Sequence, residues 1–262
     1  MKKITLLIIL LLALTYVDSS AAFDTKGFQP VQPYGTFSTL SAYTIEKDKP
    51  GIMFSLERSI QPNFYRLFIN ASYGLTDKIE LLTSVPFIFN YRGTGGIGDT
   101  SIGYKYNILS EKRLGPSISY LVGFSIPGKE TFSTLGHVGG ALLISKRVGP
   151  FRGHGNLFYF KSTSSSMEDE VELRLGLDLA AAHSFNILSE LIVKKSHFSE
   201  HIDLVEGKMG YRVKIASNSY AALGVGYDFK NRTPELRIFL TLSLFPLDQV
   251  KVKRIYYEEE KT

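Results

Sequence analysis

One short segment carries residue types that could do chemistry. Residues 197–201 read HFSEH, which places His197 two residues before Ser199. Positions two apart share one face of a strand, so the imidazole could activate the hydroxyl for attack on an ester. The asparagine and glycine neighbours that such a lipid-hydrolysing site needs are missing, and HxxxH spacing binds a metal only on a helix. We therefore expect a solvated loop, with no catalytic residue and no metal.

A second segment has the spacing of a nucleotide site. Residues 93–98 read GTGGIG and satisfy GxGxxG, a pattern that binds a pyrophosphate at the N-terminus of the helix that follows it. The next residues, DTSIGYKYNI, alternate with period two and cannot begin a helix. The pattern predicts a flexible surface loop and no cofactor.

Charged residues at alternate positions are the better functional candidate. One face of the predicted strands carries Glu57, Glu190, Lys194, Lys214 and Glu235. We predict that the same face lines the inside of a barrel with ten further residues, namely Arg66, Glu80, Lys105, Glu172, Arg174, Asp178, Lys208, Arg212, Asp228 and Arg237.

Two compatible interpretations of these charges remain open. Acids and bases could pair to fill the interior, or some could line a narrow polar path and select the charge of a permeant. Three cations on one strand, Lys208, Arg212 and Lys214, outnumber the acids there and suggest a local preference for anions.

Long alternating strands must position these residues. From Val171 to Ala181 the chain reads VELRLGLDLAA, with apolar residues on one face and charged or small ones on the other. Strands of about ten residues with this pattern are typical of a transmembrane β-barrel. We predict an all-β, antiparallel outer-membrane barrel of about twelve strands, at about 51–59, 63–73, 79–89, 99–108, 115–126, 136–147, 152–161, 169–181, 187–196, 203–215, 219–229 and 234–245.

The chain ends add four expectations. Residues 1–22 resemble a signal peptide with a cleavage site between Ala22 and Phe23. We expect residues 23–49 to form a periplasmic lead-in across the barrel mouth, and 50–245 to form the barrel. Residues 246–262 would be a periplasmic tail, either an extra strand, an adaptor or disordered. An even strand count places both termini in the periplasm.

Composition excludes several classes. The chain has no cysteine, so it has no disulfide or thiol nucleophile. A pI near 9.1 could indicate nucleic-acid binding, but the cations alternate with apolar residues and do not cluster. The expected partners are outer-membrane lipid and the barrel-assembly machinery, because the last predicted strand ends on an aromatic residue, Phe245.

Part of the sequence resembles a known family. YGLTDKIELLTSVPFIFN, followed by GIGDTSIGYKYNIL, is similar to the barrel family catalogued as "putative MetA-pathway of phenol degradation", and so is IPGKE at residues 126–130. The resemblance covers about residues 50–130. It implies a barrel of about twelve strands that transports aromatic or other hydrophobic compounds. The matching positions are Gly74, Leu75, Thr76, Asp77, Pro86, Gly96, Gly98, Asp99, Ser101, Gly103, Lys105 and Tyr106.

We expect a passive outer-membrane channel or transporter for small molecules of unknown identity. A structural or assembly barrel with a partner-binding tail is one alternative. A lipid-modifying enzyme is another, although the sequence shows no credible nucleophile and base facing one another.

Overall fold

The computed structural model describes the region that the alternation assigns to the barrel, together with part of the preceding segment. The predicted signal peptide, the Ala22–Phe23 cleavage site, residues 197–201, Glu235 and all but the first residue of the predicted tail lie outside the described residues. The described ranges are 28–60, 63–91, 94–126, 128, 137–162, 169–196, 202–229 and 236–246.

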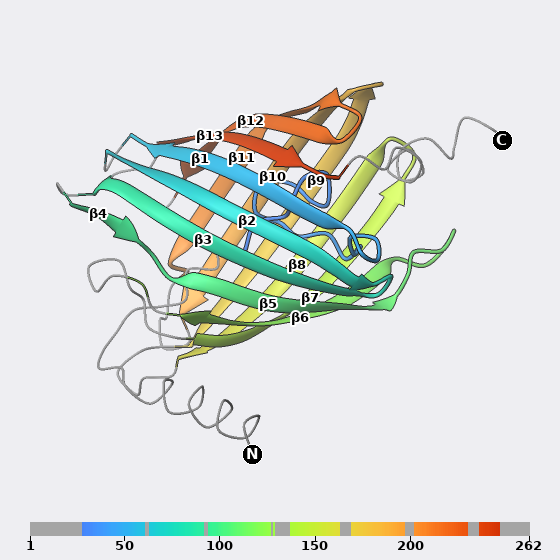
Figure 1. Ribbon diagram of the computed structural model, residues 1–262, viewed down its shortest axis with the longest axis horizontal. Helices are drawn as coiled ribbons and strands as arrows, with labels where there is room; N and C mark the ends of the chain where they lie inside the picture. The colour runs from blue at the N-terminus through green and yellow to red at the C-terminus, as the bar shows by residue number, and fades with distance from the viewer. Residues whose placement is uncertain are drawn as a thin grey trace, which may run out of the picture.

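Twelve antiparallel strands form the wall of a closed barrel (Figure 1). Consecutive wall strands pair with one another, and the last pairs with the first, which closes the sheet. This confirms the predicted fold, and the predicted strand bounds differ from the observed ones by three residues or fewer. The wall strands are β1 (Pro50–Ser59), β2 (Phe64–Thr76), β3 (Ile79–Tyr91), β5 (Thr100–Leu109), β6 (Ser117–Ile126), β7 (His137–Val148), β8 (Phe151–Ser162), β9 (Glu170–Ala182), β10 (Phe185–Ser196), β11 (Leu204–Ala216), β12 (Ser219–Asp228) and β13 (Leu236–Leu244).

A short thirteenth strand, β4 (Thr94–Ile97), occupies part of the segment that we expected to be a flexible loop. It pairs with the end of β3, where Phe87 faces Ile97 and Tyr91 faces Thr94. The expectation was wrong for these four residues because β5 pairs with β3 only as far as Ser84. Beyond that point β3 would present unpaired backbone groups, and β4 satisfies them.

The two faces of each wall strand differ as the alternation predicts. On β9, Leu173, Leu175 and Leu177 point outward, and Leu175 is 45% exposed. Their neighbours Glu172 and Arg174 point inward and are at most 2% exposed. Charged side chains are thereby kept from the lipid-facing surface, where an Arg or Lys would cost about 2–4 kcal/mol at the bilayer midplane and an Asp or Glu less.

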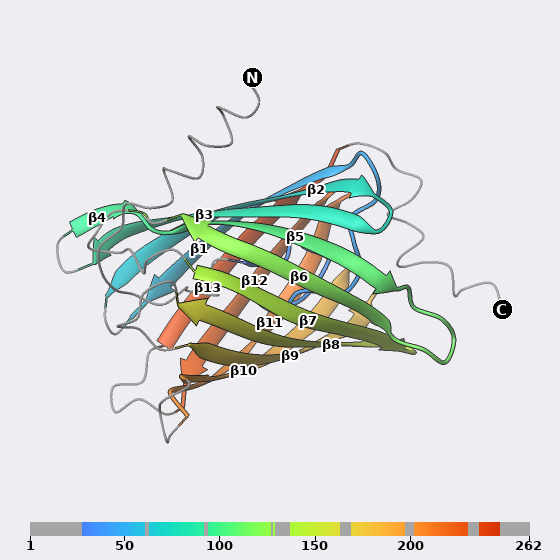
Figure 2. The same cartoon turned by 90° about the horizontal axis from the view of Figure 1, so that it is seen from below.

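The two ends of the barrel differ in their connections. Four two-residue turns, at 77–78, 149–150, 183–184 and 217–218, lie at one end, which we call the turn end. The connection from β5 to β6, residues 110–116, is also at this end, and Figure 2 shows it extending beyond the strands. The opposite end, which we call the loop end, contains the connections from β1 to β2, β3 to β5, β6 to β7, β8 to β9, β10 to β11 and β12 to β13.

None of the described residues belongs to a helix long and apolar enough to span a membrane.

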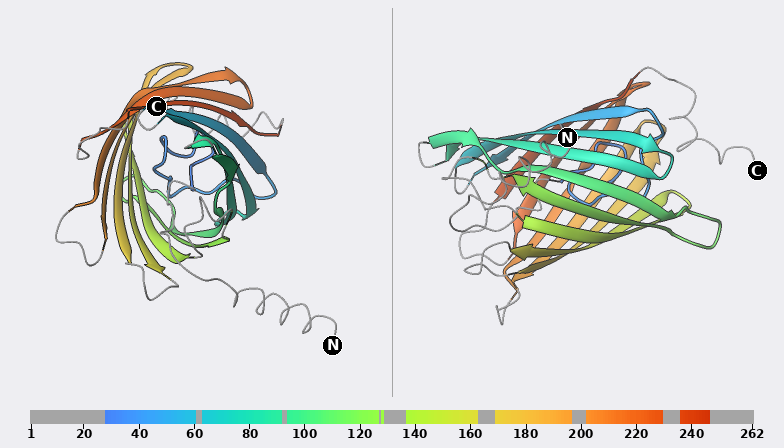
Figure 3. Two further views of the ribbon diagram at one scale, coloured as in Figure 1. Left: turned by 90° about the vertical axis from the view of Figure 1, so that its left-hand side faces the viewer. Right: turned by 60° about the horizontal axis from the view of Figure 1, so that its bottom comes forward.

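Residues 28–49, which we call the plug segment, lie inside the barrel except near their C-terminal end, where the side chains of Lys47 and Asp48 are exposed. In the left view of Figure 3 the blue segment is enclosed by the ring of strands. This differs from the lead-in across the mouth that we expected for residues 23–49. The physical reason is burial of apolar surface, since a position at the mouth would leave large side chains in water. The apolar side chains concerned are at most 3% exposed, and they are Phe28, Val31, Phe37, Leu40 and Ile45.

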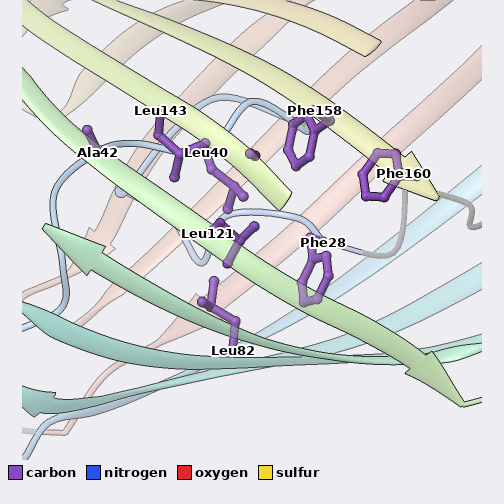
Figure 4. Packing of buried hydrophobic residues seen from close by; sticks show 9 residues of the cluster. Phe28, Leu40, Ala42, Leu82, Leu121, Leu143, Phe158 and Phe160 are labelled. Carbon is purple, nitrogen blue, oxygen red and sulfur yellow. The ribbon is translucent and has the colours of Figure 1, made fainter. Parts of the chain in front are cut away.

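Apolar residues on the inner face of the wall receive the plug segment. Leu82, Leu121 and Leu143 come from β3, β6 and β7 and pack with Phe28 and Leu40 (Figure 4). Two smaller clusters form around Ile45 and around Phe37. The lumen therefore has a hydrophobic core made jointly by wall and plug segment.

Inner-face glycines provide the room for this packing. A Cβ atom at Gly103 or Gly123 would lie 2.9 Å from the ring of Phe28. A Cβ atom at Gly176 would lie 2.6 Å from Thr36 Oγ1. Real Cβ atoms do not approach so closely, so the wall can accommodate the plug segment only where these side chains are missing.

Candidate functional site

Glu190 on β10 binds the plug segment through one carboxylate oxygen. Its Oε2 accepts hydrogen bonds from the backbone N–H groups of Ser38 and Thr39, each at 2.7 Å. It also accepts from the hydroxyls of Thr36 at 2.7 Å and Thr39 at 2.9 Å. The other oxygen, Oε1, lies 3.1 Å from Lys208 Nζ. One buried carboxylate thus satisfies four donors of the plug segment, and a cation balances its charge.

Arg174 on β9 binds carbonyl groups of the same segment. Its Nη1 donates to the Ser38 oxygen at 2.6 Å and to the Phe28 oxygen at 3.3 Å. Its Nε forms an ion pair with Glu172 at 2.6 Å, and its guanidinium lies 4.5 Å from the centre of the Phe158 ring. The side chain therefore links two parts of the plug segment to the wall.

Arg212 on β11 makes a similar set of contacts. Its Nη1 donates to the Gly35 carbonyl oxygen at 3.0 Å and to the Gln32 side-chain oxygen at 2.7 Å. Its Nη2 pairs with Asp178 at 2.5 Å. Asp178 also accepts a hydrogen bond from Asn186 at 2.7 Å. Each plug-binding arginine is accordingly neutralised by an acid of the wall.

An amide and a lysine of the wall also bind backbone groups of the plug segment. Asn156 accepts from the Leu40 N–H at 2.7 Å and donates to its carbonyl oxygen at 2.8 Å. Its side-chain amide thus makes the two hydrogen bonds that a paired strand would make with Leu40. Lys105 donates to the Tyr43 carbonyl oxygen at 2.7 Å and pairs with Glu80, also at 2.7 Å. Buried backbone groups of an irregular segment need such partners.

A serine and a histidine also meet in the lumen. Ser145 Oγ lies 2.8 Å from His154 Nδ1 and accepts a hydrogen bond from the Ala42 N–H at 2.8 Å. The pair therefore supports the plug segment, and Ser145 is fully buried. Within the described part of the chain, no group of three His, Cys, Asp or Glu side chains could hold a metal ion.

The lumen near the loop end is lined by ion pairs between wall residues. Arg66 lies 2.7 Å from Glu57, and Arg237 lies 3.3 Å from both Glu57 and Glu206. Asp228 is buried opposite Glu206 in the register of β11 and β12. These charges bind one another across strands, whereas those deeper in the barrel bind the plug segment.

All ten residues that we predicted to line the lumen lie on the inner face, and none is more than 7% exposed. Five contact the plug segment directly, namely Glu80, Lys105, Arg174, Lys208 and Arg212. Glu172 and Asp178 pair with two of those cations. The remaining three, Arg66, Asp228 and Arg237, lie in the loop-end region.

This geometry changes the interpretation of the cations on β11. The sequence suggests that Lys208 and Arg212 favour permeant anions. In the structure, Lys208 pairs with Glu190 and Arg212 pairs with Asp178, and both cations contact the plug segment. The geometry supports the alternative that acids and bases pair to fill the interior, with the plug segment as a third component.

The sequence reasoning placed the lead-in across the barrel mouth and missed that it enters the lumen, although a signal for this was present. Strand β3 carries apolar residues on both faces in IELLTSVPFIF, and β6 places Leu121 on an inner face that otherwise carries serine and glycine. A water-filled barrel would have polar inner faces, so inward Leu82 and Leu121 indicate that something apolar covers them. Nothing in the sequence pattern similarly indicated that the neutral side chains of Asn156 and Ser145 bind the plug segment.

Solved structures show what this fold is similar to. The outer membrane channel COG4313 from Pseudomonas putida F1 has a TM-score of 0.56 and 11% identity, and the match covers 78% of this chain and 97% of that chain. The KdgM porin in complex with disordered oligogalacturonate has a TM-score of 0.58 and 12% identity, covering 74% and 98%. The NanC porin has a TM-score of 0.59 and 7% identity, with the same coverage. The fold is therefore that of an outer-membrane β-barrel.

No protein-family model matches the sequence, and no curated protein matches it significantly.

Proposed function

We propose that this protein is an outer-membrane channel for small molecules, and that the plug segment closes it in the conformation described here. The observation that supports the proposal is the way the plug segment is bound. Its backbone is bound mainly by side chains of the wall, such as Glu190, Arg174 and Arg212. The likeness in fold to outer-membrane channels and porins supports the same role.

The type of binding favours a segment that can move. Only isolated bridges occur here, between Gly35 and Leu40 and between Lys47 and Gly74, so the plug segment adds no strand to the sheet. Release would break hydrogen bonds that water can replace, and such exchanges cost about 1.5–3 kcal/mol each where the wall partner is charged. The buried apolar side chains oppose release, so the closed form predominates.

Displacement would also determine the lining of the open lumen. Without Phe28 and Leu40, the inner apolar residues Leu82, Leu121 and Phe158 would face the passage beside the ion pairs. Such a lumen would admit molecules with an apolar part. This agrees with the hydrophobic or aromatic permeants that the resemblance to the phenol-degradation family implies, and we include membership of that family in the proposal.

We further propose that the turn end faces the periplasm, with both chain ends on that side. The even number of wall strands and the short turns support this orientation. Membrane lipid and the barrel-assembly machinery would then be its partners.

A structural barrel that never conducts is the second candidate, and the filled lumen favours it. A reversible covalent link separates the two. The chain has no native cysteine, so Ala42→Cys with Ser145→Cys can join the plug segment to β7, where Ser145 Oγ lies 2.8 Å from the Ala42 nitrogen.

In planar bilayers we expect openings from wild type, no openings from the oxidised double variant, and recovery on reduction. The two single variants, treated with the same oxidant and reductant, are the controls. If wild type and the reduced double variant stay silent at all applied potentials, the channel proposal fails and the structural barrel is preferred.

A further inference from the structure

The strongest unassigned feature is a cavity of about 660 Å³ at the turn end. It lies between the plug segment, the connection from β5 to β6, and the ends of β7 and β8. Five basic residues line it, namely Lys112, Arg113, Lys146, Arg147 and Arg152, together with three acidic ones, Glu46, Asp77 and Glu111. An excess of fixed cations in a concave site attracts anions.

The connection that forms one side of this cavity departs from the pattern of its end of the barrel. The other four connections there have two residues each, whereas this one spans residues 110–116 and supplies three of the eight charged lining residues. Within the part of the chain that the structure describes, the side chains of Lys112 and Arg113 form no ion pair. Long loops positioned by a rigid scaffold are common places for binding sites.

One carboxylate already occupies a set of donors in the cavity. Glu111 Oε1 accepts from the Arg147 N–H at 2.9 Å and lies 3.3 Å from Lys146 Nζ, while Oε2 accepts from the Tyr43 hydroxyl. Burial raises the pKa of Glu111, but the Tyr43 hydrogen bond and the other two donors outweigh it, so the pKa is lowered. Only 22% of this side chain is exposed. The three donors thus form a carboxylate site filled by the protein's own residue.

We propose that this cavity binds small organic anions with two or more carboxylates, one of which replaces Glu111 at the Tyr43, Lys146 and Arg147 donors. The other carboxylates would reach Lys112, Arg113 and Arg152, which line the same space. Arg152 lies 5.4 Å from the centre of the Tyr43 ring, so a cationic group lies beside the residue whose hydroxyl donates to Glu111. The inference goes beyond the proposed function, because binding is measurable whether or not the barrel conducts.

The test is calorimetric titration of the full-length chain in detergent micelles with citrate, and with glucose as the neutral control. We expect saturable citrate binding that weakens as salt is added, and no binding of glucose. Arg113 lies on an exposed connection, so Arg113→Gln should leave the barrel intact. It should weaken citrate roughly tenfold, the effect of losing one charged hydrogen bond.

Two acid-to-amide variants distinguish a defined site from diffuse attraction. Glu111→Gln removes the competing carboxylate, so it should raise citrate affinity. Asp77→Asn removes the same charge from the same cavity without touching the three donors, so its gain should be smaller. Absence of saturable binding in wild type, an unchanged affinity in Arg113→Gln, or equal gains in the two acid variants would each overturn the proposal.

Discussion

The lumen has two regions that use similar residues differently. From the middle to the turn end, wall charges such as Glu190 and Arg174 bind the plug segment. Near the loop end, Glu57, Arg66 and Arg237 bind one another. An inward charge alone therefore does not say whether a barrel is open or filled. What differs is the space beside it, since a Cβ atom at Gly103, Gly123 or Gly176 would meet the plug segment, whereas one at Gly226 would meet Phe239 and Glu206 of the wall.

The largest expected effect comes from neutralising Glu190, the carboxylate that binds the plug segment. Glu190→Gln keeps the shape of the side chain but removes the charge that binds Lys208 and four plug donors. Removing one partner of a buried ion pair costs about 3–5 kcal/mol, and we expect most of this cost to weaken plug binding. Maleimide labelling of a cysteine at Ala42, which is fully buried, should become much faster.

Glu57→Gln is the matched control, because it removes a buried acid of the loop-end region that pairs with Arg66 and Arg237 of the wall. Labelling at position 42 should stay slow in that variant. Equal acceleration by both substitutions would show that the two regions are not independent.

A smaller, steric effect should loosen the plug segment without unfolding the wall. From its polarity alone, Gly176→Ala is expected to be mild, but its Cβ would lie 2.6 Å from Thr36 Oγ1 and 3.1 Å from Thr39 Cβ. Such overpacking costs about 1–3 kcal/mol, and only the plug segment needs to move. Labelling at position 42 should rise while heat-resistant barrel migration on gels is retained.

A glycine on the adjacent strand β8 offers the control for that substitution. Gly155 faces outward, and a Cβ there would meet no atom closer than 3.9 Å. Gly155→Ala should leave labelling unchanged. If Gly176→Ala unfolds the barrel itself, the plug segment is not the more easily displaced part.

Arg237→Gln should act on the loop-end region alone. It leaves Glu57 paired with Arg66 but removes one charged partner from Glu57 and Glu206, and bonds between charged groups contribute about 1.5–3 kcal/mol. Labelling at position 42 should not change. If the Glu190→Gln variant conducts, adding Arg237→Gln should shift its reversal potential under a salt gradient towards cation selectivity, because one lumen cation is removed. A shift towards anion selectivity would contradict the placement of Arg237 in the lumen.

The smallest effect concerns acidity at the turn end. The pKa of Glu111 is lowered, so its contribution to plug binding is complete above the ordinary carboxyl pKa and is lost as the pH falls through the folded value. Reaction of a cysteine at position 42 with dithiodipyridine should therefore accelerate modestly only in strong acid. Glu111→Gln should remove that pH step. A step that persists would assign the acid response to another group.

Much of this structure could be predicted from local pattern. The alternation of Leu173, Arg174 and Leu175 sets the strand, its two faces and its register, because side chains of a strand alternate and a charge on the lipid side is costly. The same argument places all ten candidate residues on the inner face. It also gives the number of wall strands, although β4 escaped it because its partner is a strand end that β5 leaves unpaired.

The partners of the inward side chains were decided by tertiary structure. Glu190 contacts Thr39 across 151 residues, and Arg174 contacts Phe28 across 146. No local period encodes such pairs, because they depend on how twelve strands close and how much space glycines leave inside. The sequence by itself determined that these charges point inward. Only the closed barrel, with residues 28–49 folded into it, decided that they bind a segment of the chain itself.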